Sequence, residues 1–180
     1  MEYSRNDNTY KNYDVLPDPK NNYRLQTPVA GWCFGAGHNH PKLGVPIPGW
    51  GDVRFLSLLY QNSYNYNKGK VVMYIVVKNN ITSSPTTFTY ALTINNPTLL
   101  INKILADENS LGELSIDDKI QKMLDKESLY YDGGFSLIEM KFLEKYADYG
   151  INIHKATDDT LLNWKKLKLE GGVVVGEPCP

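Results

Sequence analysis

Residues 38–52 read HNHPKLGVPIPGWGD and contain the side chains of this chain that are best suited to hold a metal ion. Side chains alternate along an extended segment, so His38 and His40 project their imidazoles to the same side. Asp52, twelve residues after His40, supplies a carboxylate that can complete a three-ligand face. Catalytic zinc sites have three protein ligands and one position for water, whereas structural sites close with four. The pattern therefore predicts a metal site at His38, His40 and Asp52 that supports hydrolysis.

The same segment resembles the JAMM motif of the JAB/MPN metalloproteases, which reads His-x-His-Pro, seven residues, Ser, two residues and Asp. Here Pro41 follows the histidines, the seven residues are 42–48, and the aspartate is Asp52. The flanks are similar too, so the resemblance covers about residues 29–95. It implies an α/β fold with a mixed β-sheet flanked by helices, in a cytidine-deaminase-like layering. It also implies a Zn²⁺-dependent hydrolase of peptide or isopeptide bonds, with a protein or peptide as substrate.

Two departures from the motif concern catalysis. The family serine, which helps to stabilise the tetrahedral intermediate, falls on Gly49, and losing one such donor typically costs about 10²- to 10³-fold in rate. The family's general-base glutamate lies upstream, where Glu2 is the single glutamate before His38 and so the nominee for this role. Three interpretations stay open: Glu2 is the base, the glutamate belongs to a longer parent chain, or the site binds metal without efficient turnover. The alternative function is a non-catalytic binding or scaffold domain of the JAB/MPN fold.

The pattern around the motif predicts how its residues are carried. We expect a strand at 29–34, a loop at 42–51 and a helix from Asp52 to Tyr60. An aspartate at a helix start also caps free backbone N–H groups, so capping alone could explain Asp52. The apolar run at 71–77 predicts a strand covered on both sides, paired in a hairpin with residues 88–94.

Three further helices are predicted from their start signals. Asn96 and Pro97 open the first, Ser115 caps the second, and Ser136 with Glu139 opens the third in a capping-box arrangement.

The chain divides in this interpretation into three regions. Residues 1–28 form a loop-rich segment that reads like the end of a longer parent, residues 29–109 form the JAMM-like metal-binding core, and residues 110–180 form helices and a hairpin packed on that core. The hairpin is predicted from residues 161–169 and 173–175 around two glycines.

Composition limits the remaining function classes. At 180 residues the chain suits one domain, and 19 basic against 20 acidic side chains give no electrostatic footprint for nucleic acid. We find no apolar stretch of about 20 residues for a membrane span and no signal-peptide core. Cys33 and Cys179 make no disulfide framework. The location stays open between the cytoplasm and export within a longer bacterial secreted or toxin-type polypeptide, and the oligomeric state is unknown.

Other chemistry fits the sequence less well. Cys33 and His38 could form a thiol–imidazole pair, but an odd separation of five places them on opposite sides of a strand. The His-Asn-His segment is similar to some nuclease motifs, yet the basic surface that holds phosphates is lacking. His154 is interpreted as a partly exposed histidine near a strand end.

Overall fold

The computed structural model describes residues 2–4, 9–11, 17–18, 21–25, 30–40, 45–78, 87–131, 135–157 and 160–179, the first four ranges as backbone only. The elements in chain order are β1 (Glu2–Ser4), β2 (Thr9–Lys11), β3 (Pro17–Asp18), β4 (Asn21–Leu25), β5 (Gly35–Asn39), α1 (Trp50–Asn62), the 3₁₀ helix η1 (Asn65–Lys70), β6 (Val72–Lys78), β7 (Thr87–Ile94), α2 (Pro97–Ser110), α3 (Ile116–Tyr130), α4 (Phe135–Lys145), β8 (Ile151–Ala156), β9 (Trp164–Glu170) and β10 (Val173–Pro178).

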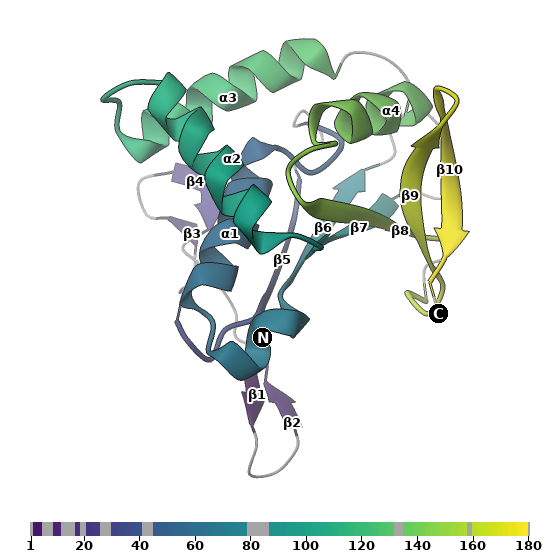
Figure 1. Cartoon of the computed structure of the whole chain (residues 1–180), viewed down its shortest axis with the longest axis horizontal. Helices are drawn as coiled ribbons and strands as arrows, with labels where there is room; N and C mark the ends of the chain where they lie inside the picture. Colours follow the sequence, from purple (N-terminus) through teal and green to yellow (C-terminus); the bar gives the residue numbers. More distant parts are fainter. Residues whose placement is uncertain are drawn as a thin grey trace.

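Six of the described strands form one mixed sheet in the order β10-β9-β8-β7-β6-β5 (Figure 1). β5 runs parallel to β6, and the other neighbouring pairs are antiparallel. A parallel pair needs a crossover connection, and α1 followed by η1 provides it between β5 and β6. The predicted α/β fold with a mixed sheet and helices is confirmed.

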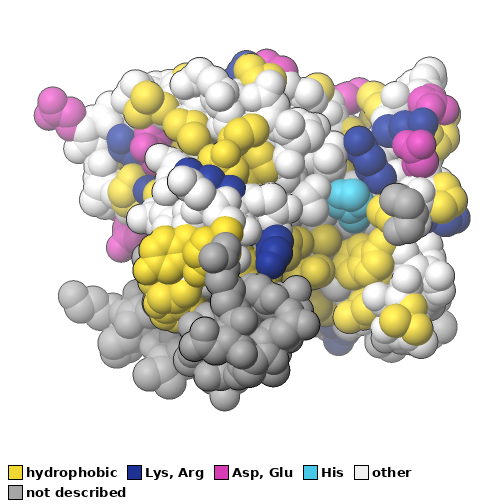
Figure 2. All heavy atoms as spheres, turned by 60° about the horizontal axis from the view of Figure 1, so that its bottom comes forward, with side chains coloured by type: hydrophobic (Ala, Val, Ile, Leu, Met, Phe, Trp, Pro, Cys, Tyr) yellow, Lys and Arg dark blue, Asp and Glu magenta, His cyan; other side chains and the backbone are white. Residues whose placement is uncertain are grey.

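The core lies between one face of this sheet and the helices. Met73, Ile75 and Val77 of β6 are buried, whereas the residues between them are only half-buried, since successive side chains point to opposite faces. Buried side chains of α1, α2, α3 and α4 join Ile75 in one hydrophobic cluster. The predicted interior strand at 71–77 is confirmed as β6, and its two faces differ in burial, one being buried and the other half-buried. On the side of the molecule away from α2, α3 and α4, hydrophobic side chains reach the surface (Figure 2).

Two boundaries next to the motif differ from the predictions. The apolar run expected as a strand at 29–34 contains a turn, closed by the hydrogen bond from Cys33 N to Ala30 O (2.9 Å), and β5 begins only at Gly35. Gly37 suits this strand, because a Cβ there would lie 3.3 Å from Cβ of Tyr74 on β6. The helix starts at Trp50 rather than at Asp52, with Gly49 as its N-cap residue.

The predicted starts of α2 and α3 are confirmed, and that of α4 is corrected. The Asn96 side chain accepts from Leu99 N, and the Ser115 side chain accepts from Asp118 N. α4 begins one residue before Ser136. Ser136 therefore lies inside the helix and cannot be the N-cap residue of a capping box with Glu139. Glu139 Oε1 instead accepts from Tyr90 Oη and Lys155 Nζ, both at 2.7 Å. Glu139 thus ties α4 to the sheet.

Both ends of the chain form β-structure. β1 pairs with β2 and β3 with β4 in two separate antiparallel ladders, so the described parts of residues 1–28 are more regular than the expected loops. At the other end, β9 and β10 form the expected hairpin and continue the main sheet beside β8. Within the described residues, no helix combines the length and the apolar character that crossing a bilayer requires.

Candidate metal centre

β5 aims both histidines of the motif at the helix-covered side of the sheet. In the parallel register His38 lies opposite Ile75, a fully buried residue of β6. Side chains at paired positions share a face, so the His38 imidazole points toward α1. His40 is the next residue on that side, and its backbone N donates to Val76 O (2.8 Å).

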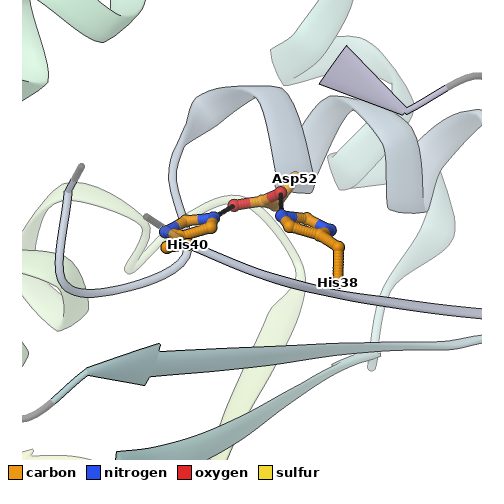
Figure 3. Close-up of side chains that lie close together, drawn as sticks. All are labelled: His38, His40 and Asp52. Carbon is orange, nitrogen blue, oxygen red and sulfur yellow. Dashed lines mark ion pairs between the residues drawn. The ribbon is translucent and has the colours of Figure 1, made fainter. Parts of the chain in front are cut away.

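α1 brings Asp52 to the two imidazoles (Figure 3). The His38 Nε2–Asp52 Oδ1 and His40 Nε2–Asp52 Oδ2 distances are both 3.2 Å. Oδ2 also accepts a hydrogen bond from the backbone N of Gly49 (2.7 Å), so the carboxylate caps its own helix as well. Capping and contact with the histidines, which the sequence offered as competing explanations of Asp52, thus occur together.

The distances suit a metal ion. One donor atom from each of His38, His40 and Asp52 can be chosen so that all lie within 4.8 Å of one another. Ligands about 2.0–2.1 Å from a tetrahedral zinc ion are about 3.3 Å apart, close to the two nitrogen–oxygen separations. His40 Nδ1 lies 2.7 Å from the carbonyl oxygen of Val45, to which it can donate its proton. Such a bond leaves Nε2 as the ligand nitrogen, as is usual for metal-binding histidines. The group could therefore bind a metal ion.

Without a metal, Asp52 and His40 shift each other's pKa. Burial raises the pKa of Asp52, but the hydrogen bonds from His38 and His40, together with the charges of the two rings, outweigh burial and hold the pKa well below its ordinary value. Burial lowers the pKa of His40, yet its bond to the Asp52 carboxylate, with further help from Val45 O, raises it on balance. A proton on His40 and a metal ion on Nε2 thus compete for the same nitrogen.

A buried carboxylate of α3, a helix far along the chain from the motif, holds the start of α1 beside the metal centre. Glu127 is 1% exposed, and its Oε2 accepts from Trp50 N (2.8 Å) at the start of α1. Its Oε1 accepts from Lys145 Nζ and Tyr146 Oη, both at 2.6 Å. The Trp50 ring is held too, since Nε1 donates to Asp107 Oδ2 of α2 (2.7 Å). The residues that fix the start of α1 therefore come from three other helices.

Glu127 also occupies the space beside the position of the family serine. A Cβ on Gly49 would lie 2.9 Å from Glu127 Oε2 and 4.0 Å from Asp52 Oδ2. The absence of a side chain at Gly49 thus leaves room for the Glu127 carboxylate. The sequence pattern did not predict a role for Glu127. The sequence feature that could have revealed Glu127 is its position: it is a charged residue on a helix face that otherwise carries the apolar residues Ile116, Ile120 and Met123.

The remaining predicted residues lie apart from this centre or outside the description. The side chain of Glu2 falls outside the described residues, so its nomination as the base stays a prediction. His154 is on β8, which two strands separate from β5 in the sheet.

Gly49→Ala is expected to lower the free energy of unfolding by about 1–2 kcal/mol, because alanine is a poor N-cap residue and its methyl group would collide with Glu127. Gly51→Ala is the matched control. Its Cβ would make an ordinary 3.7 Å contact with Ile120, and alanine inside a helix is expected to add up to about 1 kcal/mol. Urea denaturation followed by circular dichroism measures both; equal effects of the two substitutions would contradict the crowding at Gly49.

The metal-free protein should show a distinct pH dependence of stability. The folded pKa of His40 lies above its ordinary 6.5, so its contribution is complete below that pH and lost as the pH rises through the folded value. The contribution of Asp52 is complete above its ordinary 3.8 and lost as the pH falls through its lowered folded value.

We therefore expect the free energy of unfolding of the chelator-treated wild type, relative to His40→Gln, to fall above about pH 6.5, by at most about 1.4 kcal/mol per pH unit. A saturating divalent metal should reverse the trend, because coordination requires neutral imidazoles. Denaturation curves at a series of pH values measure the difference, and a flat difference without metal would show that His40 gains nothing from Asp52.

Comparison with protein-family models, with curated proteins and with solved structures finds no match to this chain. The likeness to JAB/MPN proteins therefore rests on the motif and on its flanks.

Proposed function

We propose that this protein is a zinc-dependent hydrolase of peptide or isopeptide bonds, similar to the JAMM metalloproteases. The observation that carries the proposal is the convergence of His38, His40 and Asp52, with both Nε2 atoms 3.2 Å from the carboxylate oxygens. Two imidazoles and one carboxylate are a ligand set of catalytic zinc sites, which leave a position open for water or substrate. The His38 and His40 side chains are 22% and 15% exposed, so solvent has access.

A bound zinc ion supplies Lewis acidity, which brings the pKa of a coordinated water to about 7 and polarises a carbonyl group. The chain's own residues hold and orient the ligands. Val45 O fixes the His40 ring through Nδ1, and the N–H of Gly49 fixes the Asp52 carboxylate. Glu127 holds the first turn of α1 in place through Trp50. This preorganisation is what a reaction centre requires, since misplaced ligands cost rate.

The resemblance to the JAMM family makes Glu2 the nominee for the proton acceptor of the attacking water. Glu127 is a poor base, because both of its oxygens already accept hydrogen bonds from Trp50, Lys145 and Tyr146. Gly49 offers no hydroxyl to the developing oxyanion, so turnover should be about 10²- to 10³-fold slower than with a serine donor. We infer a slow hydrolase.

The second candidate is a non-catalytic binding or scaffold domain of the same fold. The observation that favours it is Glu127, whose carboxylate lies against the position where the family places its serine. Measurements of metal content and of cleavage separate the two candidates.

The wild type purified with zinc in the medium is expected to retain about one zinc ion per chain after desalting, and His40→Ala is expected to retain none, because two remaining ligands bind weakly. His154→Ala is the matched control and should retain zinc, since His154 lies on another strand. Elemental analysis of zinc, iron and manganese identifies the ion, as two histidines and one carboxylate also suit iron. Metal-free wild type that cannot be reloaded with zinc would remove the hydrolase and favour the scaffold.

The zinc-loaded wild type is expected to cleave an isopeptide-linked ubiquitin-like conjugate or members of a peptide panel, with the rate abolished by a chelator and restored by zinc. Asp52→Asn should lower the rate at least 10²-fold, because the amide is a weaker ligand and perturbs both histidines. Gel electrophoresis and mass spectrometry of the products measure cleavage. Zinc binding without cleavage would favour the scaffold, and cleavage that is indifferent to Asp52→Asn would contradict the proposed mechanism.

A further inference from the structure

A second group of reactive side chains lies away from the metal centre and comes from β7, from β8 and from the residue that follows β10. His154 Nδ1 lies 3.3 Å from Cys179 Sγ, and His154 Nε2 lies 3.0 Å from Thr93 Oγ1. With the ring protonated at Nε2, that N–H donates to the threonine hydroxyl. The lone pair of Nδ1 then faces the thiol. This is the order of a nucleophile, a base and a residue that orients the base.

These residues occupy the opposite face of the sheet from the metal ligands. His154 pairs with Ala91, and Ala91 pairs with Tyr74 of β6. Tyr74 is half-buried and lies between the buried residues Met73 and Ile75 of that strand. Because alternate residues face opposite sides, the ring of His154 is on the face without the helices, whereas His38 shares the face of Ile75.

The sheet holds the thiol in place beside a cavity. The backbone N of Cys179 donates to Trp164 O (2.9 Å), and the preceding residue Pro178 is in register with Lys165. A cavity of about 330 Å³ adjoins the cysteine and is lined by Asn163, Trp164 and Lys165, among others. This volume is within the range of small-molecule sites.

The imidazole is in the protonation state that a base requires. Burial, with the positive charge of Lys166 as a second cause, lowers the pKa of His154 below its ordinary value. Its ring is therefore neutral at pH 7 and can accept a proton from the thiol. Cys33, the other cysteine, is buried at 4% exposure and sits in the hydrophobic core, so Cys179 is the thiol that solvent reaches.

We propose that Cys179 and His154 form an activated thiol site that undergoes thiol–disulfide exchange with a small anionic disulfide bound in the adjoining cavity. The anionic preference comes from Lys166, which is in register with His154 and shares its face of the sheet. Exchange requires only an attacking thiolate and a group that carries the proton, and both are present.

The exchange is balanced as written. The thiol proton moves to His154 Nδ1, and the sulfur of Cys179 attacks one sulfur of the external disulfide. The external S–S bond breaks as the new mixed disulfide forms, and the leaving thiolate takes the proton from the imidazolium. The external disulfide is the oxidant, and one thiol is released per Cys179 oxidised. The site needs no metal, so it is independent of the proposed hydrolase.

The test is the reaction of the folded, chelator-treated chain at pH 7 with Ellman's reagent, an aromatic disulfide with two carboxylates whose released thiolate is coloured. We expect one equivalent of coloured thiolate to be released rapidly, at a higher rate than free glutathione releases it from the same reagent under the same conditions. Cys179→Ser should abolish this rapid phase. His154→Gln should slow it about tenfold or more, since the base is lost. Loss of the rapid phase in Cys33→Ala instead, or an unchanged rate in His154→Gln, would overturn the proposal.

The charge preference is tested by comparing Ellman's reagent with the neutral 2,2′-dithiodipyridine. Lys166→Gln should slow only the anionic reagent, and Lys165→Gln, the neighbouring lysine on the other face of the sheet, should slow neither. Equal slowing of both reagents by Lys166→Gln would overturn the anionic assignment. Circular dichroism melting curves accompany every variant, and only those that melt at the wild-type temperature enter the comparison. If His154→Gln fails this criterion, His154→Asn replaces it, because this variant also lacks the base.

Discussion

Two carboxylates bind the free N–H groups at the start of α1, and the arrangement of the metal centre depends on this contact. The first N–H groups of a helix have no partner within it and carry partial positive charge. Asp52 satisfies the one at Gly49, and Glu127 satisfies the one at Trp50. The first contact is local, whereas the second joins residues 77 positions apart. The aspartate that faces the histidines is thus set by its own helix and by α3.

Such an arrangement places several charges out of water, and each has a counterpart. Burying an unpaired carboxylate costs several kcal/mol, but Asp52 faces His38 and His40, and Glu127 faces Lys145. The polar groups close to α1 form a connected set in which each oxygen of Glu127 has a donor. Satisfied networks of this kind fix a single geometry. This rigidity is consistent with a site that must hold a metal ion at fixed distances.

The two faces of the sheet differ in chemistry because the helices pack on only one of them. The face toward the helices buries Met73, Ile75 and Val77 of β6, whereas the side chains of His38 and His40 on β5 and just after it are partly exposed. The other face is half-buried along β6, and there His154 contacts Cys179 and Thr93. Side-chain alternation separates the two groups by the thickness of one sheet. A metal centre and a thiol can therefore occur in one small chain without sharing residues.

The sequence by itself determined what depends on neighbouring residues. Alternation placed both histidines on one side, the starts of α2 and α3 followed from Asn96 and Ser115, and two glycines marked the β9–β10 turn. The strand boundary at Gly35 was missed, because pairing with β6 outweighs the low strand propensity of glycine. Only the tertiary structure decided that Glu127 lies against Gly49 and that Cys179 lies against His154. Those contacts join helices and strands far apart in the chain, and no local pattern encodes such distances.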